Sequence, residues 1–178
     1  GIAFDPLGTA NMTRVSVVGC GNMGGAFLKG LAGVGAHHLT AIDLDPDALE
    51  AVEEAATETT DDIAAAKEAE VVIVAVKPDV VGAILDDRDL SADQTLVTLA
   101  AGVSREFVAD RTDASVVRIM PNLAAETGNM AAAATEESLT DEVRELLDDV
   151  GEFVEVDESL MDIATAVNGS GPAFVFYL

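Results

Sequence analysis

The chain has 178 residues, which suffices for one domain with a sizeable core, and 49% of them are hydrophobic, so we expect a folded protein rather than a disordered one. Its 33 acidic and 9 basic side chains give a formal net charge of −24; such a surface repels nucleic-acid phosphates and anionic lipids, which excludes nucleic acid and membrane as partners. The acidity is that of an ordinary acidic protein or, as we favour, an adaptation to a salt-rich cytoplasm.

The compartment and the natural start of the chain follow from short-range features. No apolar run reaches the roughly 18 residues that span a bilayer, and residues 1–11 lack the basic start and apolar centre of a signal peptide. The single cysteine, Cys20, rules out an internal disulfide and fits a reducing, cytoplasmic compartment. Met12 directly precedes a strand-like run, so we interpret residues 1–11 as an added leader outside the fold.

Strands and helices alternate along the remainder. Short apolar, β-branched runs predict strands and 3.6-residue apolar spacing predicts helices, in this chain order: strand 14–18, helix 23–31, strand 39–42, helix 49–56, strand 57–60, helix 63–68, strand 71–76, helix 81–85, strand 95–99, helix 104–109, strand 116–120, strand 130–134, helix 143–150 and strand 153–156. Because the strands are almost wholly apolar, they are expected to form a mostly parallel sheet with helices on both faces, a doubly wound α/β fold.

A glycine-rich loop follows the first strand and opens the first helix. Its pattern is G-x-G-x-x-G, in which the glycines permit a tight turn, close approach of the backbone to a pyrophosphate and close packing of helix on strand. The helix N-terminus then attracts the diphosphate through its free N–H groups and its dipole. The loop therefore predicts a Rossmann-like dinucleotide-binding domain, with cofactor-binding residues Gly19, Cys20, Gly21, Asn22, Met23 and Gly24.

Asp43 ends the second strand, 19 residues beyond Gly24. A carboxylate at this distance accepts hydrogen bonds from the adenosine ribose hydroxyls and repels a 2′-phosphate, so NADH is expected to be preferred over NADPH. The alternative is that Asp43 and its acidic neighbours decorate a turn and cap the next helix. Pro46 after Asp45 supports a capping role for Asp45.

The other candidate ligands and nucleophiles favour structural roles. Cys20 is a small filler between glycines, since no base lies near it in the sequence. His37 and His38 lead into a strand away from the expected site. Histidine, cysteine and carboxylates are not clustered at metal-ligand spacing, so no metal is predicted.

Five segments together resemble the pyrroline-5-carboxylate reductases, in the order in which that family carries them. The first combines residues 17–26 with Lys29, Gly30 and Leu31, and the second is the strand-tip tetrapeptide Ala75-Val76-Lys77-Pro78. The remaining three are segments 100–103, 118–122 and 169–173. The resemblance covers residues 14–178.

The resemblance implies hydride transfer from reduced NAD or NADP to the imine carbon of 1-pyrroline-5-carboxylate, giving L-proline. It places cofactor at Ala75, Val76, Lys77, Pro78, Ala101 and Gly102, and substrate near Met120, Pro121 and Asn122, all at carboxyl ends of strands, where open α/β sheets bind ligands. No catalytic residue is certain; Glu158 falls where the family often places an acid. Arg118 forms a salt bridge under the sheet or has a functional role, and Lys77 is a cofactor contact or a solvated strand end.

The resemblance also implies a domain organisation. Residues 12–168 are expected to form the dinucleotide-binding domain and residues 169–178 the start of a helical, dimer-forming domain that holds the substrate carboxylate. The apolar face at 160–167 is interrupted at 168–172, and a new apolar stretch at 173–178 stops without a cap. We therefore expect a fragment of a homo-oligomeric enzyme that lacks the full substrate site.

Two other functions remain open. β-Hydroxyacid dehydrogenases and deazaflavin-dependent NADP reductases share the fold, but would need a catalytic lysine farther along the chain or basic side chains near Asp43. A non-catalytic NAD(H)-sensing module is expected to carry a basic, DNA-reading face, which the charge of −24 does not offer.

Overall fold

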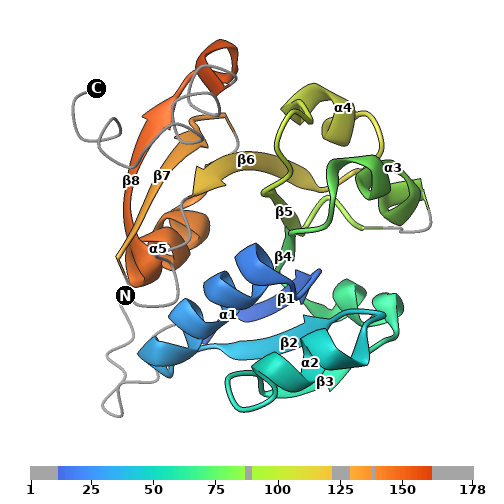
Figure 1. Cartoon of the computed structure of the whole chain (residues 1–178). Helices are drawn as coiled ribbons and strands as arrows, with labels where there is room; N and C mark the ends of the chain where they lie inside the picture. Colours follow the sequence, from blue (N-terminus) through green and yellow to red (C-terminus); the bar gives the residue numbers. More distant parts are fainter. Residues whose placement is uncertain (1–11, 87–89, 122–128, 138, 162–178) are drawn as a thin grey trace, which may run out of the picture.

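The computed structural model describes residues 12–86, 90–121, 129–137 and 139–161. Within these residues one sheet of eight strands forms the centre of the molecule (Figure 1). The strands are β1 (Arg14–Val18), β2 (His38–Ile42), β3 (Glu58–Thr60), β4 (Val71–Val74), β5 (Thr95–Thr98), β6 (Ser115–Pro121), β7 (Met130–Thr135) and β8 (Gly151–Val156).

The strand order across the sheet is β3-β2-β1-β4-β5-β6-β7-β8. The first six strands in sequence are parallel; Val17, for example, lies between Ala41 of β2 and Ile73 of β4. β7 runs antiparallel to β6, with Met120 opposite Ala133, and β8 is parallel to β7. The carboxyl ends of β1, β2, β4, β5 and β6 therefore meet at one edge of the sheet.

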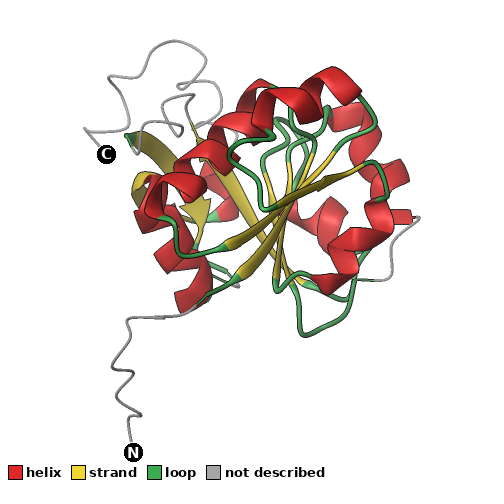
Figure 2. Ribbon diagram, turned by 90° about the horizontal axis from the view of Figure 1, so that it is seen from below, coloured by secondary structure: helices red, strands yellow, loops and turns green. Residues whose placement is uncertain are grey.

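Helices cover both faces of the sheet (Figure 2). One layer contains α1 (Asn22–Val34), α2 (Pro46–Val52) and α5 (Asp141–Val150), whose buried side chains share a cluster with alternate residues of the strands. The second layer contains the 3-10 helix η1 (Ile63–Glu68), α3 (Pro78–Asp86) and α4 (Arg105–Ala109). A last 3-10 turn, η3 (Glu158–Leu160), follows β8.

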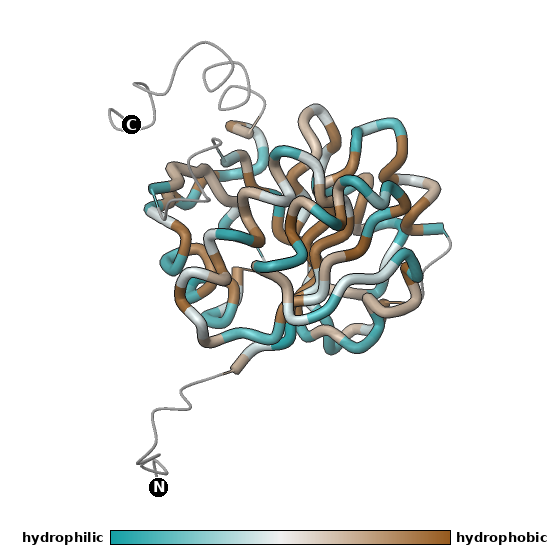
Figure 3. The backbone as a smooth tube through the Cα atoms, turned by 60° about the horizontal axis from the view of Figure 1, so that its bottom comes forward, coloured by the Kyte–Doolittle hydropathy of each residue, from teal (hydrophilic) through white to brown (hydrophobic). Residues whose placement is uncertain are grey.

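The strands are apolar because each of them is buried on two faces. In β4, Val71 and Ile73 pack into the cluster under α1 and α5, while Val72 and Val74 pack into the cluster under α3 and α4. Because successive side chains of a strand point to opposite faces of the sheet, one apolar run contributes to both hydrophobic cores. The hydrophobic residues accordingly concentrate along the central strands in Figure 3.

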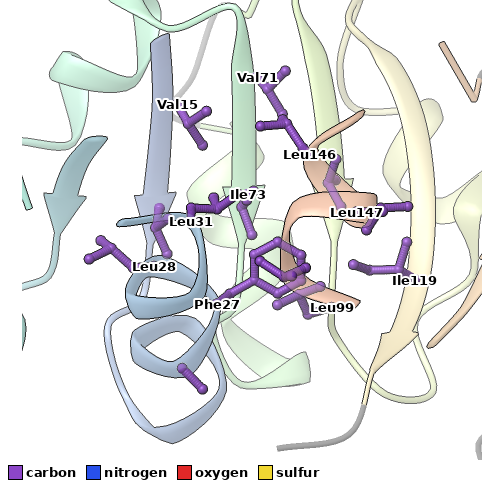
Figure 4. Close-up of a cluster of buried hydrophobic side chains, with 14 of the residues drawn as sticks. Val15, Phe27, Leu28, Leu31, Val71, Ile73, Leu99, Ile119, Leu146 and Leu147 are labelled. Atoms are coloured by element: carbon purple, nitrogen blue, oxygen red, sulfur yellow. The ribbon is translucent and has the colours of Figure 1, made fainter. Parts of the chain in front are cut away.

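The larger core joins α1 to α5. Figure 4 shows Phe27 and Leu31 of α1 and Leu146 and Leu147 of α5 in one cluster, with Ile73 of β4 between the two helices. All five side chains are at most 2% exposed. Truncating a buried leucine in such a core to alanine costs about 2–5 kcal/mol, so this seam fixes α1, and with it the loop before α1, on the sheet.

The predicted elements are confirmed in order, with four instructive differences in type or bounds. The helix predicted over 49–56 is α2, which begins at Pro46 and ends at Val52. Residues 63–68 form a 3-10 helix, which begins where the Asp62 side chain accepts a hydrogen bond from Ala64 N at 3.0 Å. β4 ends at Val74, because Ala75 and Val76 leave the sheet alongside the loop after β1. α3 begins at Pro78, three residues earlier than predicted, as a proline at the first helical position allows. The leader predicted at residues 1–11 and the domain boundary predicted at residue 168 lie outside the described residues.

Candidate functional site

The loop between β1 and α1 is held against two neighbouring strands. Gly19 N donates to Ile42 O at 2.9 Å, at the end of β2, and Ala75 N donates to Val18 O at 2.8 Å. Gly19 has φ +90°, a conformation that a residue with a side chain rarely adopts. A Cβ on Gly19 would also lie 2.8 Å from Ala75 O, so glycine is required here by space as well as by torsion.

The other two glycines of the pattern have opposite surroundings. A Cβ on Gly24 would overlap the carbonyl oxygen of Gly19 and lie 3.1 Å from Ala75 Cβ, so Gly24 permits the close packing of α1 on the loop. A Cβ on Gly21 would meet no described atom within 4 Å. Gly21 therefore presents bare backbone to an open space, as an approaching phosphate requires.

The first turn of α1 is suited to an anion. Gly21 is the N-cap residue and makes no side-chain capping hydrogen bond, and the first turn contains no acidic residue. The N–H groups of Asn22 and Met23 at this end carry the positive end of the helix dipole. A dinucleotide pyrophosphate fits this end of the helix, because it supplies the acceptors that the cap does not.

The Asp43 carboxylate accepts hydrogen bonds from the backbone of the same loop and of its own turn. Its Oδ2 accepts a hydrogen bond from Cys20 N at 2.7 Å, and its Oδ1 accepts one from Asp45 N at 2.9 Å. Each carboxylate oxygen keeps further acceptor capacity. The turn-stabilising role is thus present, and it orients the carboxylate at the mouth of the loop. The capping role predicted for Asp45 is confirmed, since its Oδ1 accepts from Asp47 N at 3.0 Å.

The side chain of Cys20 faces inward, and its environment disfavours the reactive thiolate. Its side chain is buried, with Sγ 3.6 Å from Val17 O and 3.7 Å from Ile42 O. Burial, followed by the nearby Asp43 carboxylate, raises the pKa of the Cys20 thiol to about 12. Only the backbone of Cys20 is presented to the loop, in agreement with a filler rather than a nucleophile.

A groove of about 360 Å³ runs from the glycine loop along the carboxyl ends of β1, β2 and β4. Gly19, Gly21 and Asp43 form one end of the groove, and the exposed residue Lys77 also lines it. The remaining wall is apolar and was not predicted from the sequence: Leu44, Ile63, Val80 and Ile84. Leu44 is 75% exposed. A leucine set between two aspartates in a turn was the sequence signal for this wall.

The strand-tip residues expected near a nicotinamide lie at the same edge. Ala75 and Val76 flank the groove, and Pro78 is the first residue of α3. After β5, Ala101 is exposed and Gly102 adopts φ +74° in the turn that leads to α4. The structure thus brings the predicted cofactor residues together along one edge of the sheet.

The residues expected near the substrate lie at the end of β6. Met120 is 7% exposed and packs with Ala133 and Met161, and Pro121 is the last residue of the strand. Asn122 lies outside the described residues. In the described ranges, no group of three or more histidine, cysteine or acidic side chains is placed to hold a metal ion. No helix there is long and apolar enough to cross a membrane.

Arg118 and Glu158 are paired beneath this strand end. Arg118 Nη1 lies 2.9 Å from Glu158 Oε1, and the Arg118 side chain is 2% exposed. The same Glu158 oxygen accepts from Arg105 N at 2.9 Å. One of the two roles expected of Arg118, a salt bridge under the sheet, is present. The contact of Arg105 with the same carboxylate was not predicted from the sequence.

His37 connects the loop before β2 to helix α5. Its Nε2 lies 2.7 Å from Asp149 Oδ2 in the last turn of α5. This contact lies between the loop before β2 and α5, away from the groove, and it supports the structural role expected for His37.

Comparison with known proteins identifies the family. The family model described as NADP oxidoreductase, coenzyme F420-dependent, matches residues 14–102. A pyrroline-5-carboxylate reductase of Mycobacterium leprae is 36% identical, over 95% of this chain and 63% of that protein. One of Corynebacterium melassecola is 32% identical, over 93% and 67% respectively. The chain thus spans less than two thirds of the length of the first of these relatives.

A solved structure agrees with these relatives. The crystal structure of 1-pyrroline-5-carboxylate reductase from Streptococcus pyogenes has a TM-score of 0.80 and 27% identity, over 94% of this chain and 67% of that one. The broad family model matches the first half of the chain, and the two sequence relatives named above match more than nine tenths of it. The chain belongs to the pyrroline-5-carboxylate reductase family.

Proposed function

We propose that the whole protein reduces 1-pyrroline-5-carboxylate to L-proline with a reduced nicotinamide dinucleotide. The observation that carries the proposal is the open backbone at Gly21 beside the uncapped start of α1, in a chain of this family. That arrangement fits a pyrophosphate and leaves the groove along β1, β2 and β4 for the adenosine half. The nicotinamide half then extends toward the turns after β4 and β5.

The dinucleotide supplies the hydride, and the chain supplies position. The glycine loop and the helix N-terminus hold the diphosphate, and the turns at Val76–Lys77 and Ala101–Gly102 bound the reacting ring. Protonation of the imine nitrogen makes its carbon far more electrophilic, so no strong base is required and alignment of the two reactants accounts for the rate. Met120 and Pro121 lie at the end of β6, and we assign them, together with Asn122, to the substrate.

Asp43 favours NADH over NADPH. Both of its oxygens are oriented by backbone N–H groups at the mouth of the groove, where their remaining lone pairs suit ribose hydroxyls. A 2′-phosphate there would meet Asp43 together with Asp45 and Asp47 on the same turn. Lys77 is the cation that lines the groove, and we assign it to the dinucleotide rather than to solvent.

Glu158 is the acid proposed near the substrate. Its Oε2 is buried and has no hydrogen-bond partner in the part of the chain that the structure describes, so it retains capacity for a donor. The substrate carboxylate would be held by the segment that follows residue 168 in the family, which also builds the dimer. The protein is accordingly proposed to be a homo-oligomer.

The cellular setting follows from composition. A net charge of −24 repels itself at low ionic strength and is screened in a salt-rich cytoplasm. We therefore propose a cytoplasmic, salt-adapted enzyme of proline biosynthesis.

Isotope transfer tests the reaction. The whole protein is incubated in concentrated KCl with 1-pyrroline-5-carboxylate and NADH that carries deuterium at both C4 positions of the nicotinamide, so that either hydride transferred is labelled. Proline with a single deuterium on the ring carbon that was the imine carbon is expected. Unlabelled proline, or no proline from protein that is folded and binds NADH, would refute the proposal.

A further inference from the structure

A buried cation lies under the carboxyl end of β6. Arg118 is the largest of the fully buried side chains. A buried charge is destabilising unless it is paired and hydrogen-bonded, and an apolar residue of similar volume is often at least as stable in its place. Arg118 therefore needs an explanation other than packing.

The ion pair of Arg118 joins three elements through one oxygen. Glu158 Oε1, at the start of η3, accepts from Arg118 Nη1 and from Arg105 N, both at 2.9 Å. Arg105 is the first residue of α4, and its Nε donates to Val116 O of β6 at 2.8 Å. The start of α4, the middle of β6 and η3 are thus fixed relative to one another.

A fourth contact extends this arrangement to β7. Arg118 N donates to Thr135 Oγ1 at 3.0 Å, and Thr135 is buried at the end of β7. The antiparallel junction between β6 and β7 is therefore tied to the same residue. Figure 1 shows β6 running from the side of the molecule that carries α4 to the side that carries β7 and β8.

The element that this network anchors carries part of the proposed site. Only Val103 and Ser104 separate Gly102 from Arg105, and Val103 is 9% exposed. A shift of the first residue of α4 must therefore move the turn at Ala101–Gly102, while β6 carries Met120 and Pro121. The glycine loop and Asp43 lie on the other side of β4 in the strand order and have no hydrogen bond to the network among the contacts of the described residues.

We propose that Arg118 is a positioning residue for imine reduction. Acting through Glu158 and the first N–H of α4, it fixes the Ala101–Gly102 turn against the end of β6, and so aligns the nicotinamide with the substrate. The inference rests on the proposed function. It assigns to Arg118 an effect on hydride transfer that is separate from the binding of the adenosine half.

The test uses the whole protein and four forms: wild type, Arg118→Met, the double variant Arg118→Met/Glu158→Met, and Arg144→Met as a control. The double variant leaves no unpaired buried charge, so it is expected to fold even if the single variant does not. Arg144→Met removes a partly exposed ion pair with Glu155, between α5 and β8. Each form is checked for folding by circular dichroism, and then NADH affinity and single-turnover hydride transfer are measured.

We expect both Arg118 forms to slow hydride transfer by about ten- to a hundredfold, the cost of a misaligned reacting pair. Their NADH dissociation constants are expected to stay within about twofold of wild type, as for sites without shared partners. The double variant is expected to be at least as slow as the single variant, because it also removes Glu158, the acid proposed near the substrate. The single variant therefore measures the effect of Arg118 wherever it folds. Arg144→Met is expected to react as wild type does.

Two results overturn the inference on different grounds. If wild type reduces the imine and the double variant transfers hydride within about twofold of the wild-type rate, Arg118 is merely structural and only this inference fails. If folded wild type does not reduce the imine at all, the proposed function fails and the inference fails with it.

Discussion

Replacing Gly21 by alanine separates dinucleotide binding from folding. Gly21 has φ −69° and ψ −158°, which alanine adopts without strain, and the new Cβ would meet no described atom within 4 Å. The free energy of unfolding is therefore expected to change by no more than about 0.5 kcal/mol, as at an ordinary surface position. The same methyl group would stand between the backbone and the pyrophosphate.

The expected loss of affinity follows from that contact. Forcing an extra methyl group into a close-packed contact costs about 1–3 kcal/mol, which corresponds to about 5- to 150-fold weaker binding of NADH. Nicotinamide fluorescence titration measures the affinity, and thermal melting of the same samples measures stability.

Gly24→Ala is the matched contrast, because its Cβ would overlap the carbonyl oxygen of Gly19 and lie 3.1 Å from Ala75 Cβ. It is expected to lower the free energy of unfolding by about 1–3 kcal/mol, or the melting temperature by about 2–4 °C per kcal/mol for a chain of this size. If Gly21→Ala binds NADH as wild type does, the pyrophosphate does not lie at this loop. If Gly24→Ala melts as wild type does, the packing argument is wrong.

Three further predictions concern Asp43, Cys20 and the surface charge. Asp43→Ser is expected to weaken NADH binding about 10- to 150-fold, because it removes hydrogen bonds to a charged acceptor, and to lower the ratio of NADH affinity to NADPH affinity. Asp43→Asn, which keeps one acceptor oxygen, is the control. An unchanged affinity ratio in parallel fluorescence titrations would refute the ribose role. Burial raises the pKa of the Cys20 thiol from 9.0 to about 12, so a thiol reagent at pH 8 is expected to label Cys20 only in denaturant. The stability that the neutral thiol contributes is expected to be intact below pH 9.0 and to be lost as the pH rises toward 12. Rapid labelling of the folded protein would contradict the burial of Cys20. Raising KCl from 0.1 M to 1 M shortens the screening length from about 10 Å to about 3 Å, so the melting temperature is expected to rise, and a flat or falling melting temperature would argue against salt adaptation of the −24 surface.

The sequence predicts the sheet well because parallel buried strands require continuous apolar runs. Val71 to Val74 shows this directly, since its residues alternate between two cores. The glycine pattern was likewise readable, because the fixed spacing of Gly19, Gly21 and Gly24 reflects contacts within one loop and one helix turn. Such features are local, so the chain order carries them.

Features that depend on distant contacts were not readable in this way. The carboxylate of Glu158 meets Arg118 across 40 residues, and no spacing rule predicts such a pair. The apolar wall of the groove is assembled by the fold from the turn after β2, from η1 and from α3, and consists of Leu44, Ile63, Val80 and Ile84. β4 ends early because Ala75 and Val76 pass next to Gly19, a contact that the apolar run at 71–76 does not reveal.

The most direct test of the account is the initial rate at which the whole protein oxidises NADH and NADPH in the presence of 1-pyrroline-5-carboxylate, in concentrated KCl. We expect imine-dependent oxidation with L-proline as product, faster with NADH than with NADPH at low dinucleotide concentration, and strongly reduced in Gly21→Ala. Protein that is folded and binds dinucleotide, yet oxidises neither dinucleotide when the imine is added, would contradict the account.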